Sequence, residues 1–79
     1  MEWLQSISRT LADRTATQTI TLTPDAVRTL LDVARIASHT SGERINAPLL
    51  CYVLGMMDAR GVPLEKTAAV IKETLGEDA

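Results

Sequence analysis

With 79 residues and a net charge of −2, this chain is long enough for one small domain and has no surplus of basic residues. Nucleic-acid binding normally requires a concentrated basic face, whereas the Arg and Lys residues here are scattered from Arg9 to Lys72. The single cysteine, Cys51, excludes an internal disulfide, and with only one histidine in the chain there are too few ligands for a structural zinc site. We therefore expect no metal and no cofactor.

The size of the chain favours a partner. Chains of this length bury only roughly 60 % of the surface that they expose when unfolded, so small domains usually add a disulfide, a metal or a second chain. With the first two excluded, we expect a homodimer. The start of the chain lacks the basic residues and apolar run of a secretory signal, and a lone thiol fits a reducing compartment, so we expect a cytoplasmic protein.

The first segment is predicted to be a short docking helix over residues 2–13. Trp3, Ile7 and Leu11 recur at four-residue intervals and form one apolar face, which we expect to pack through Trp3. Residues 14–22 then alternate threonine with other residues, which favours an extended linker because β-branched threonine disfavours helix. Pairing of this extended edge with another chain is the alternative.

The second helix has clear boundary signals. Thr23 can cap it, Pro24 suits its first position and Gly42 suits its end. Its polar face carries Asp32 and Arg35, among others. The residues that we predict to be buried share the opposite face: Val27, Leu30, Leu31, Ala34, Ala37 and Ser38.

The third helix contains the most apolar stretch of the chain, PLLCYVLGMM at residues 48–57. A helix that is apolar all round is normally buried on most sides, so we predict that residues 48–60 form the central helix. Seven large side chains are expected to fill the core: Leu49, Tyr52, Val53 and Met56, with Leu50, Leu54 and Met57 beside them. A remaining stripe of small residues, Cys51, Gly55 and Ala59, predicts close packing of another helix or of a second copy. Glycine inside a helix costs about 1 kcal/mol relative to alanine, and close packing would offset that cost.

A fourth helix is predicted from Pro63 to Leu75, with an inner stripe of Leu64, Ala68, Ile71 and Leu75. The expected fold is therefore all-α. It is a single domain over residues 1–79, a small four-helix bundle whose three-helix core covers residues 23–76.

One group of polar residues deserves a functional interpretation: Asp32, Arg35, His39, Glu43 and Arg44. The first three are helix neighbours, and the other two follow in the next turn, where we expect them close to His39. A carboxylate beside an imidazole can serve as an acid–base pair. However, amphipathic helices normally carry charges on their outer face, and the chain has no second histidine, serine elbow or phosphate loop. We therefore predict no catalytic residue, and we interpret Cys51 as a packing residue.

Several segments between residues 27 and 57 together resemble a known family pattern. They are Leu31–Arg35, Ala37–His39, Glu43–Arg44, Ala47–Leu49 and Tyr52–Gly55. The pattern is similar to that of an uncharacterised family of small, mainly actinobacterial helical domains, found alone or attached to molybdenum cofactor guanylyltransferase-like proteins. The resemblance implies an accessory role near molybdopterin guanine dinucleotide synthesis. It does not imply guanylyltransferase activity, which needs a nucleotide-binding α/β domain.

Three functional hypotheses follow. The first is a non-enzymatic accessory domain that works by protein–protein contact, as a homodimer and with a possible partner in molybdenum cofactor synthesis. The second is a domain that binds a small molecule, a nucleotide or a pterin through Arg35, His39 and Arg44. The third is DNA binding through a helix-turn-helix formed by the second and third helices. The third is disfavoured because the recognition helix would be PLLCYVLGMM, which offers few groups that read bases.

Overall fold

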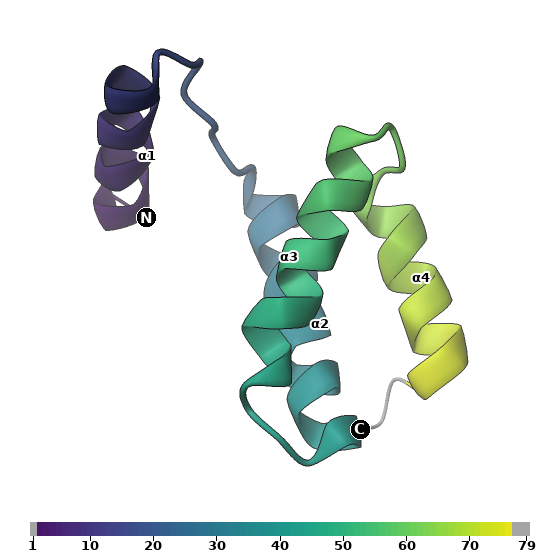
Figure 1. The fold of residues 1–79 in the computed structure, drawn as a ribbon. Helices are drawn as coiled ribbons and strands as arrows, with labels where there is room; N and C mark the ends of the chain where they lie inside the picture. The colour runs from purple at the N-terminus through teal and green to yellow at the C-terminus, as the bar shows by residue number, and fades with distance from the viewer. Residues whose placement is uncertain (1, 77–79) are drawn as a thin grey trace.

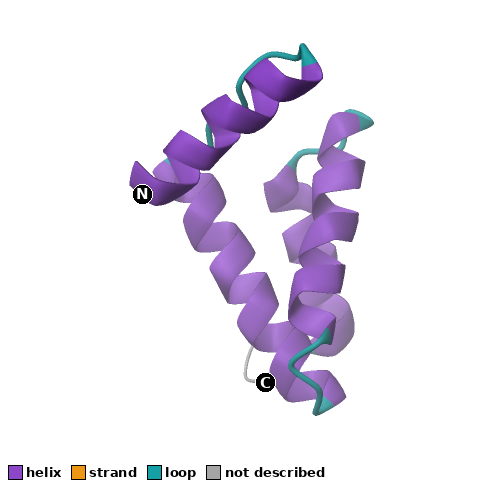
Figure 2. Ribbon diagram, turned by 60° about the vertical axis from the view of Figure 1, so that its left-hand side comes forward, coloured by secondary structure: helices purple, strands orange, loops and turns teal. Residues whose placement is uncertain are grey.

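The computed structural model describes residues 2–76, which form four α-helices joined by three connections (Figure 1). The helices are α1 (Glu2–Thr15), α2 (Pro24–Ser41), α3 (Asn46–Ala59) and α4 (Leu64–Leu75). Helices and loops account for all of residues 2–76, without a strand (Figure 2). The predicted all-α class is therefore confirmed.

The ends of α2 form through the residues that the sequence singled out. The hydroxyl of Thr23 accepts a hydrogen bond from the backbone N–H of Ala26 at 3.1 Å, and Pro24 occupies the first helical turn. At the other end, Gly42 has a φ of 74°, a left-handed conformation that glycine adopts without a steric penalty. Its N–H donates to the carbonyl of Ser38 at 3.0 Å and closes the helix.

The hydrophobic core lies between α2, α3 and α4. Val33, Leu54 and Ala68 contribute one buried side chain from each helix. Four partly buried residues pack around this centre: Leu30, Leu50, Leu64 and Ile71. On α4 the predicted inner stripe is therefore largely confirmed, although Leu75 at its end is exposed.

The predicted buried face of α2 is confirmed at Ala37 but wrong at Leu31, and it omitted Val33 and Ile36. Val33, Ile36 and Ala37 are the buried residues of this helix, whereas Leu31 is 65 % exposed. The physical reason is that α2 is apolar over a wide arc, and two helices, α3 and α4, decide which part of that arc is covered. The sequence pattern of α2 alone does not contain the positions of these neighbours.

The prediction that α3 is buried on most sides is wrong, although α3 does pack against both α2 and α4. Leu54 is the one fully buried residue on α3, and Leu49, Tyr52, Val53 and Met56 are exposed. Each of α2, α3 and α4 packs against the other two, and α2 supplies the most buried residues, three. Three short helices provide neighbours for only one side of α3, so its other apolar side faces outward.

The first helix stands apart from the other three (Figures 1 and 2). No Cα atom of α1 lies within 8 Å of a Cα atom in α2, α3 or α4, and Trp3 is 75 % exposed. The prediction that α1 docks through Trp3 is therefore wrong for this chain by itself.

The linker, rather than the bundle, covers part of α1. The N–H of Thr17 donates to the carbonyl of Ala12 at 2.9 Å, and the Gln5 side-chain amide donates to the hydroxyl of Thr21 at 3.1 Å. Ala12 is the one buried residue of α1. The linker thus runs back along α1 and leaves the face of Trp3 uncovered.

Candidate functional site

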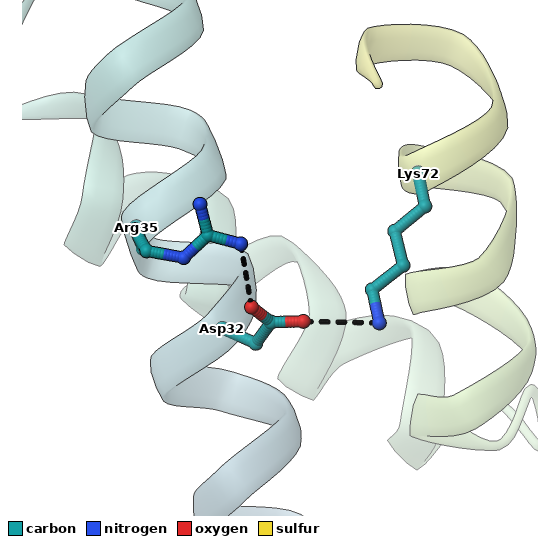
Figure 3. Close-up of polar contacts among 3 residues, drawn as sticks. All are labelled: Asp32, Arg35 and Lys72. Carbon is teal, nitrogen blue, oxygen red and sulfur yellow. Dashed lines mark hydrogen bonds and ion pairs between the residues drawn. The ribbon is translucent and has the colours of Figure 1, made fainter. Parts of the chain in front are cut away.

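The predicted polar face contains one ion-pair cluster, which joins α2 to α4 (Figure 3). On α2, the Arg35 guanidinium contacts one carboxylate oxygen of Asp32 at 2.8 Å. The Lys72 ammonium, on α4, contacts the other oxygen of Asp32 at 2.9 Å. About a third of the Asp32 and Lys72 side chains is exposed. The cluster is therefore half open to solvent and links two helices of the bundle.

The two cations keep Asp32 ionised. The hydrogen bond from Arg35, followed by that from Lys72, holds the pKa of the Asp32 carboxyl below its usual range. A carboxylate in this state is a poor general base because it binds protons only weakly. The arrangement supports a structural link between α2 and α4 and offers no acid–base pair.

The ionisation of Asp32 predicts a pH-dependent stability. A carboxyl whose pKa is lower in the folded state stabilises the fold above its unfolded pKa, about 3.9 for aspartate, and this contribution is lost as the pH falls through the folded value. We expect wild type to be more stable than Asp32→Asn at neutral pH. We expect the difference to shrink as the pH falls below about 3.9 and to close once the pH lies below the folded-state pKa. Urea unfolding followed by circular dichroism across this pH range measures the gap.

Glu73→Gln is the matched control for this experiment. Glu73 lies on α4 beside Lys72, is exposed and makes no ion pair with any of residues 2–76. The substitution removes the same charge without removing an ion pair. A gap between wild type and Asp32→Asn that does not shrink as the pH falls below about 3.9 would contradict the role assigned to the pair.

The remaining members of the predicted polar group do not join the cluster. His39 is exposed near the end of α2, and Glu43 and Arg44 lie in the turn that follows. Within residues 2–76, no hydrogen bond or ion pair connects His39 to either of them. A nearby polar side chain bonds to the backbone instead: the Ser41 hydroxyl donates a hydrogen bond to the carbonyl of Ala37 at 2.6 Å. Arg35 is held by Asp32, which leaves little to support an anion site built from Arg35, His39 and Arg44.

Of the predicted stripe of Cys51, Gly55 and Ala59, Cys51 packs against another helix of the bundle, and Gly55 and Ala59 do not. The thiol of Cys51 faces α2 and lies 3.5 Å from the carbonyl of Leu30, and burial raises its pKa, which is unfavourable for a reactive thiolate. A Cβ atom added at Gly55 would meet no atom within 4 Å, and Ala59 is exposed. No helix of the bundle therefore approaches Gly55 closely, because the neighbours of α3 lie on its Leu54 side. Contact of this stripe with a second copy stays a prediction.

The most unusual surface of the molecule is the outer side of α3. We call it the α3 face; it consists of Leu49, Tyr52, Val53 and Met56, all exposed, and Tyr52 is 68 % exposed. Their spacing places them along one side of the helix. An open groove with a volume of about 420 Å³ lies beside this face, where Leu49 and Val53 meet Leu50 and Leu75.

A second exposed apolar surface lies on α1. We call it the α1 face, formed by Trp3, Ile7 and Leu11, all of which are exposed. Their four-residue spacing again aligns them along one side of a helix. Trp3 and Tyr52, the two aromatic residues of the chain, therefore each lie on one of the two exposed apolar faces.

The sequence pattern predicted the residues of the α3 face but placed them in the core. Residues 46–57 contain no charged side chain, so helical periodicity cannot distinguish the inner side of α3 from the outer side. The number of helices in the chain is the signal that could have identified this exposed face. A chain of this size has too few helices to surround a helix that is apolar all round.

Other kinds of site find no support in the part of the chain that the structure describes. Among residues 2–76, no three His, Cys, Asp or Glu residues gather where they could hold a metal ion. None of the four described helices combines the length and the apolar character needed to cross a membrane.

Comparison with known proteins places the chain in a family. Neither the curated proteins nor the solved structures contain a match to the chain. The model of one protein family matches residues 1–78, nearly the whole sequence, and its description is a domain of unknown function. That description names no source organism and no link to molybdenum cofactor synthesis. On the strength of this nearly complete match, the chain belongs to the family of domains of unknown function designated DUF6457.

Proposed function

We propose that this chain is a non-enzymatic accessory domain that acts by binding protein through its exposed apolar surface. The main observation in support of this proposal is the amount of surface that the chain exposes. Its accessible surface is 5985 Å² for a mass of 8.6 kDa. A compact folded monomer of this mass exposes about 4,700 Å², so the excess is roughly 1,300 Å².

The dimensions of the molecule support the same interpretation. The radius of gyration is 13.6 Å, and the principal extents are 39 × 25 × 19 Å. A compact domain of this length has a radius of about 11.6 Å. The excess surface therefore comes from an elongated arrangement in which α1 stands apart from the bundle (Figure 1).

The chemistry of the exposed surface favours protein as the ligand. The α3 face presents an aromatic residue, a methionine and two aliphatic residues without a charge among them. Cores of protein interfaces are depleted of charged residues and enriched in Tyr, Trp and Met. In contrast, the charged cluster at Asp32 is occupied by its own ion pairs.

One candidate for the bound protein comes from the resemblance described above. The segments between residues 27 and 57 resemble domains linked to molybdenum cofactor guanylyltransferase-like proteins, so such an enzyme is the first partner to test. A cytoplasmic setting belongs to this proposal. It is supported by the single, half-buried free thiol.

The experiment compares partner binding by wild type and by a variant of the α3 face. The full chain, tagged at its C-terminus, is used for affinity capture with quantitative mass spectrometry and then for calorimetry with the purified partner, starting with a molybdenum cofactor guanylyltransferase. We expect the double variant Tyr52→Ser, Val53→Ser to bind at least about tenfold more weakly than wild type.

Leu31→Ser provides the matched control. Leu31 is an exposed leucine on α2 and lies outside both apolar faces, so its replacement should leave the affinity for the partner unchanged. Equal binding of the partner by wild type and the double variant would contradict the role of the α3 face. Absence of any protein whose recovery differs between wild type and the double variant would contradict the proposed function as a whole.

A further inference from the structure

The two exposed apolar faces match one another in length and character. Both α1 and α3 contain 14 residues, which corresponds to about 21 Å each. The α1 face extends over about 12 Å from Trp3 to Leu11, and the α3 face over about 10 Å from Leu49 to Met56. Neither face includes an acidic side chain, so pairing them would bury no carboxylate.

The two faces do not meet within one chain. No Cα atom of α1 lies within 8 Å of α3, and the two views show the helices well separated (Figures 1 and 2). The hydrogen bonds from Thr17 to Ala12 and from Gln5 to Thr21 tie the linker to α1, and neither involves the bundle. Packing α1 onto α3 of the same chain would require α1 to swing away from its present position relative to the bundle.

We propose that the chain forms a two-fold symmetric dimer in which α1 of each copy packs along the α3 face of the other copy. The inference rests on the proposed function, because it identifies one partner of the exposed apolar surface as a second copy of the chain. Two-fold symmetry uses both faces of both copies in a single closed assembly.

The total exposed area leaves room for such a dimer. Stable interfaces bury about 800 Å² per partner, and each chain exposes roughly 1,300 Å² beyond the expectation for a compact monomer. The groove beside Leu49 and Val53 extends the α3 face and offers a recess for a side chain of α1 from the second copy. Trp3, the largest exposed apolar side chain of α1, fits this role because buried tryptophan dominates many interfaces.

The test is a mixing experiment with the full chain, measured by sedimentation velocity from low to high micromolar concentration. Ile7→Glu places a negative charge in the α1 face, and Val53→Lys places a positive charge in the α3 face. Both residues are exposed, so neither substitution should unfold the monomer. We expect wild type to be a dimer and each variant to self-associate at least about tenfold more weakly. Circular dichroism confirms that each variant remains helical.

The mixture of the two variants gives the decisive result. In a mixed dimer, one α1–α3 contact brings the introduced carboxylate opposite the introduced ammonium, and the other contact is entirely wild type. We therefore expect the mixture to form a dimer at least about tenfold more tightly than either variant alone. Leu31→Glu, a charge on an exposed site outside both faces, should leave the wild-type dimer intact.

Trp3 supplies an independent readout because it is the only tryptophan. We expect its fluorescence emission to shift to longer wavelength when wild type is diluted and its indole becomes exposed. A monomeric wild type at high micromolar concentration would overturn the inference, and so would variants that dimerise as tightly as wild type. Failure of the mixture to restore the dimer would show that the two faces do not pack on each other. Partner binding through the α3 face would then still support the proposed function, so the two failures can be distinguished.

Discussion

Replacement of Leu54 by alanine is expected to lower the free energy of unfolding by about 2–5 kcal/mol. Leu54 is fully buried between α2 and α4, where it packs against Val33 and Ala68. Removing its branched end leaves a cavity at the one point where three helices meet. Because domains of this size have little stability to lose, we expect partial unfolding at room temperature, measurable by urea titration with circular dichroism.

Leu31→Ala is the matched control for the Leu54 experiment. It makes the same chemical change on α2, the helix against which Leu54 packs, but at a position that is 65 % exposed. Its effect on the free energy of unfolding should stay within about 0.5 kcal/mol. Equal losses for Leu31→Ala and Leu54→Ala would show that the core does not lie between α2, α3 and α4.

Enlargement of Ala68 to leucine is expected to destabilise the fold by about 1–3 kcal/mol. Ala68 is buried on α4 at the centre of the core, so a larger side chain must displace α4 or force its neighbours from their preferred rotamers. The free energy of unfolding measures this cost. A displacement of α4 would also separate Lys72 on α4 from Asp32 on α2 and so break their ion pair.

Ala69→Leu tests whether the effect comes from packing. Ala69 is the next residue on the same helix, but it is exposed. Leucine and alanine are both good helix formers, so this control should change the free energy of unfolding by about 0.5 kcal/mol or less. If Ala69→Leu destabilised the fold more than Ala68→Leu, the side of α4 that carries Ala68 would not be the side that faces the core.

The features that were predictable from the sequence are those that depend on local chemistry. Thr23, Pro24 and Gly42 define the ends of α2 through capping and backbone conformation, which need no knowledge of the rest of the fold. The stripe of Leu64, Ala68 and Ile71 identified the inner side of α4 because that helix is polar elsewhere.

The features that were not predictable depend on which segments become neighbours. The sequence offers Asp32 and Arg35 as helix neighbours, but Lys72 lies 40 positions from Asp32 and joins it only through the packing of α4 on α2. Likewise, Tyr52 and Leu54 lie on the same apolar helix, and one is exposed while the other is buried. A helix that is apolar all round can pack on any of its sides. Its sequence pattern therefore does not predict which side is buried.

The separation of α1 from the bundle divides the molecule into two parts of unequal cooperativity. The bundle shares one core, so α2, α3 and α4 unfold together, whereas α1 is held by the linker and shares no core with them. A helix of 14 residues is marginal in isolation. A molecule that covers Trp3 and binds only the helical form of α1 would stabilise this helix by mass action. The helix content of α1 would then depend on the concentration of that molecule. The folding of α2, α3 and α4 would depend on the core that they share.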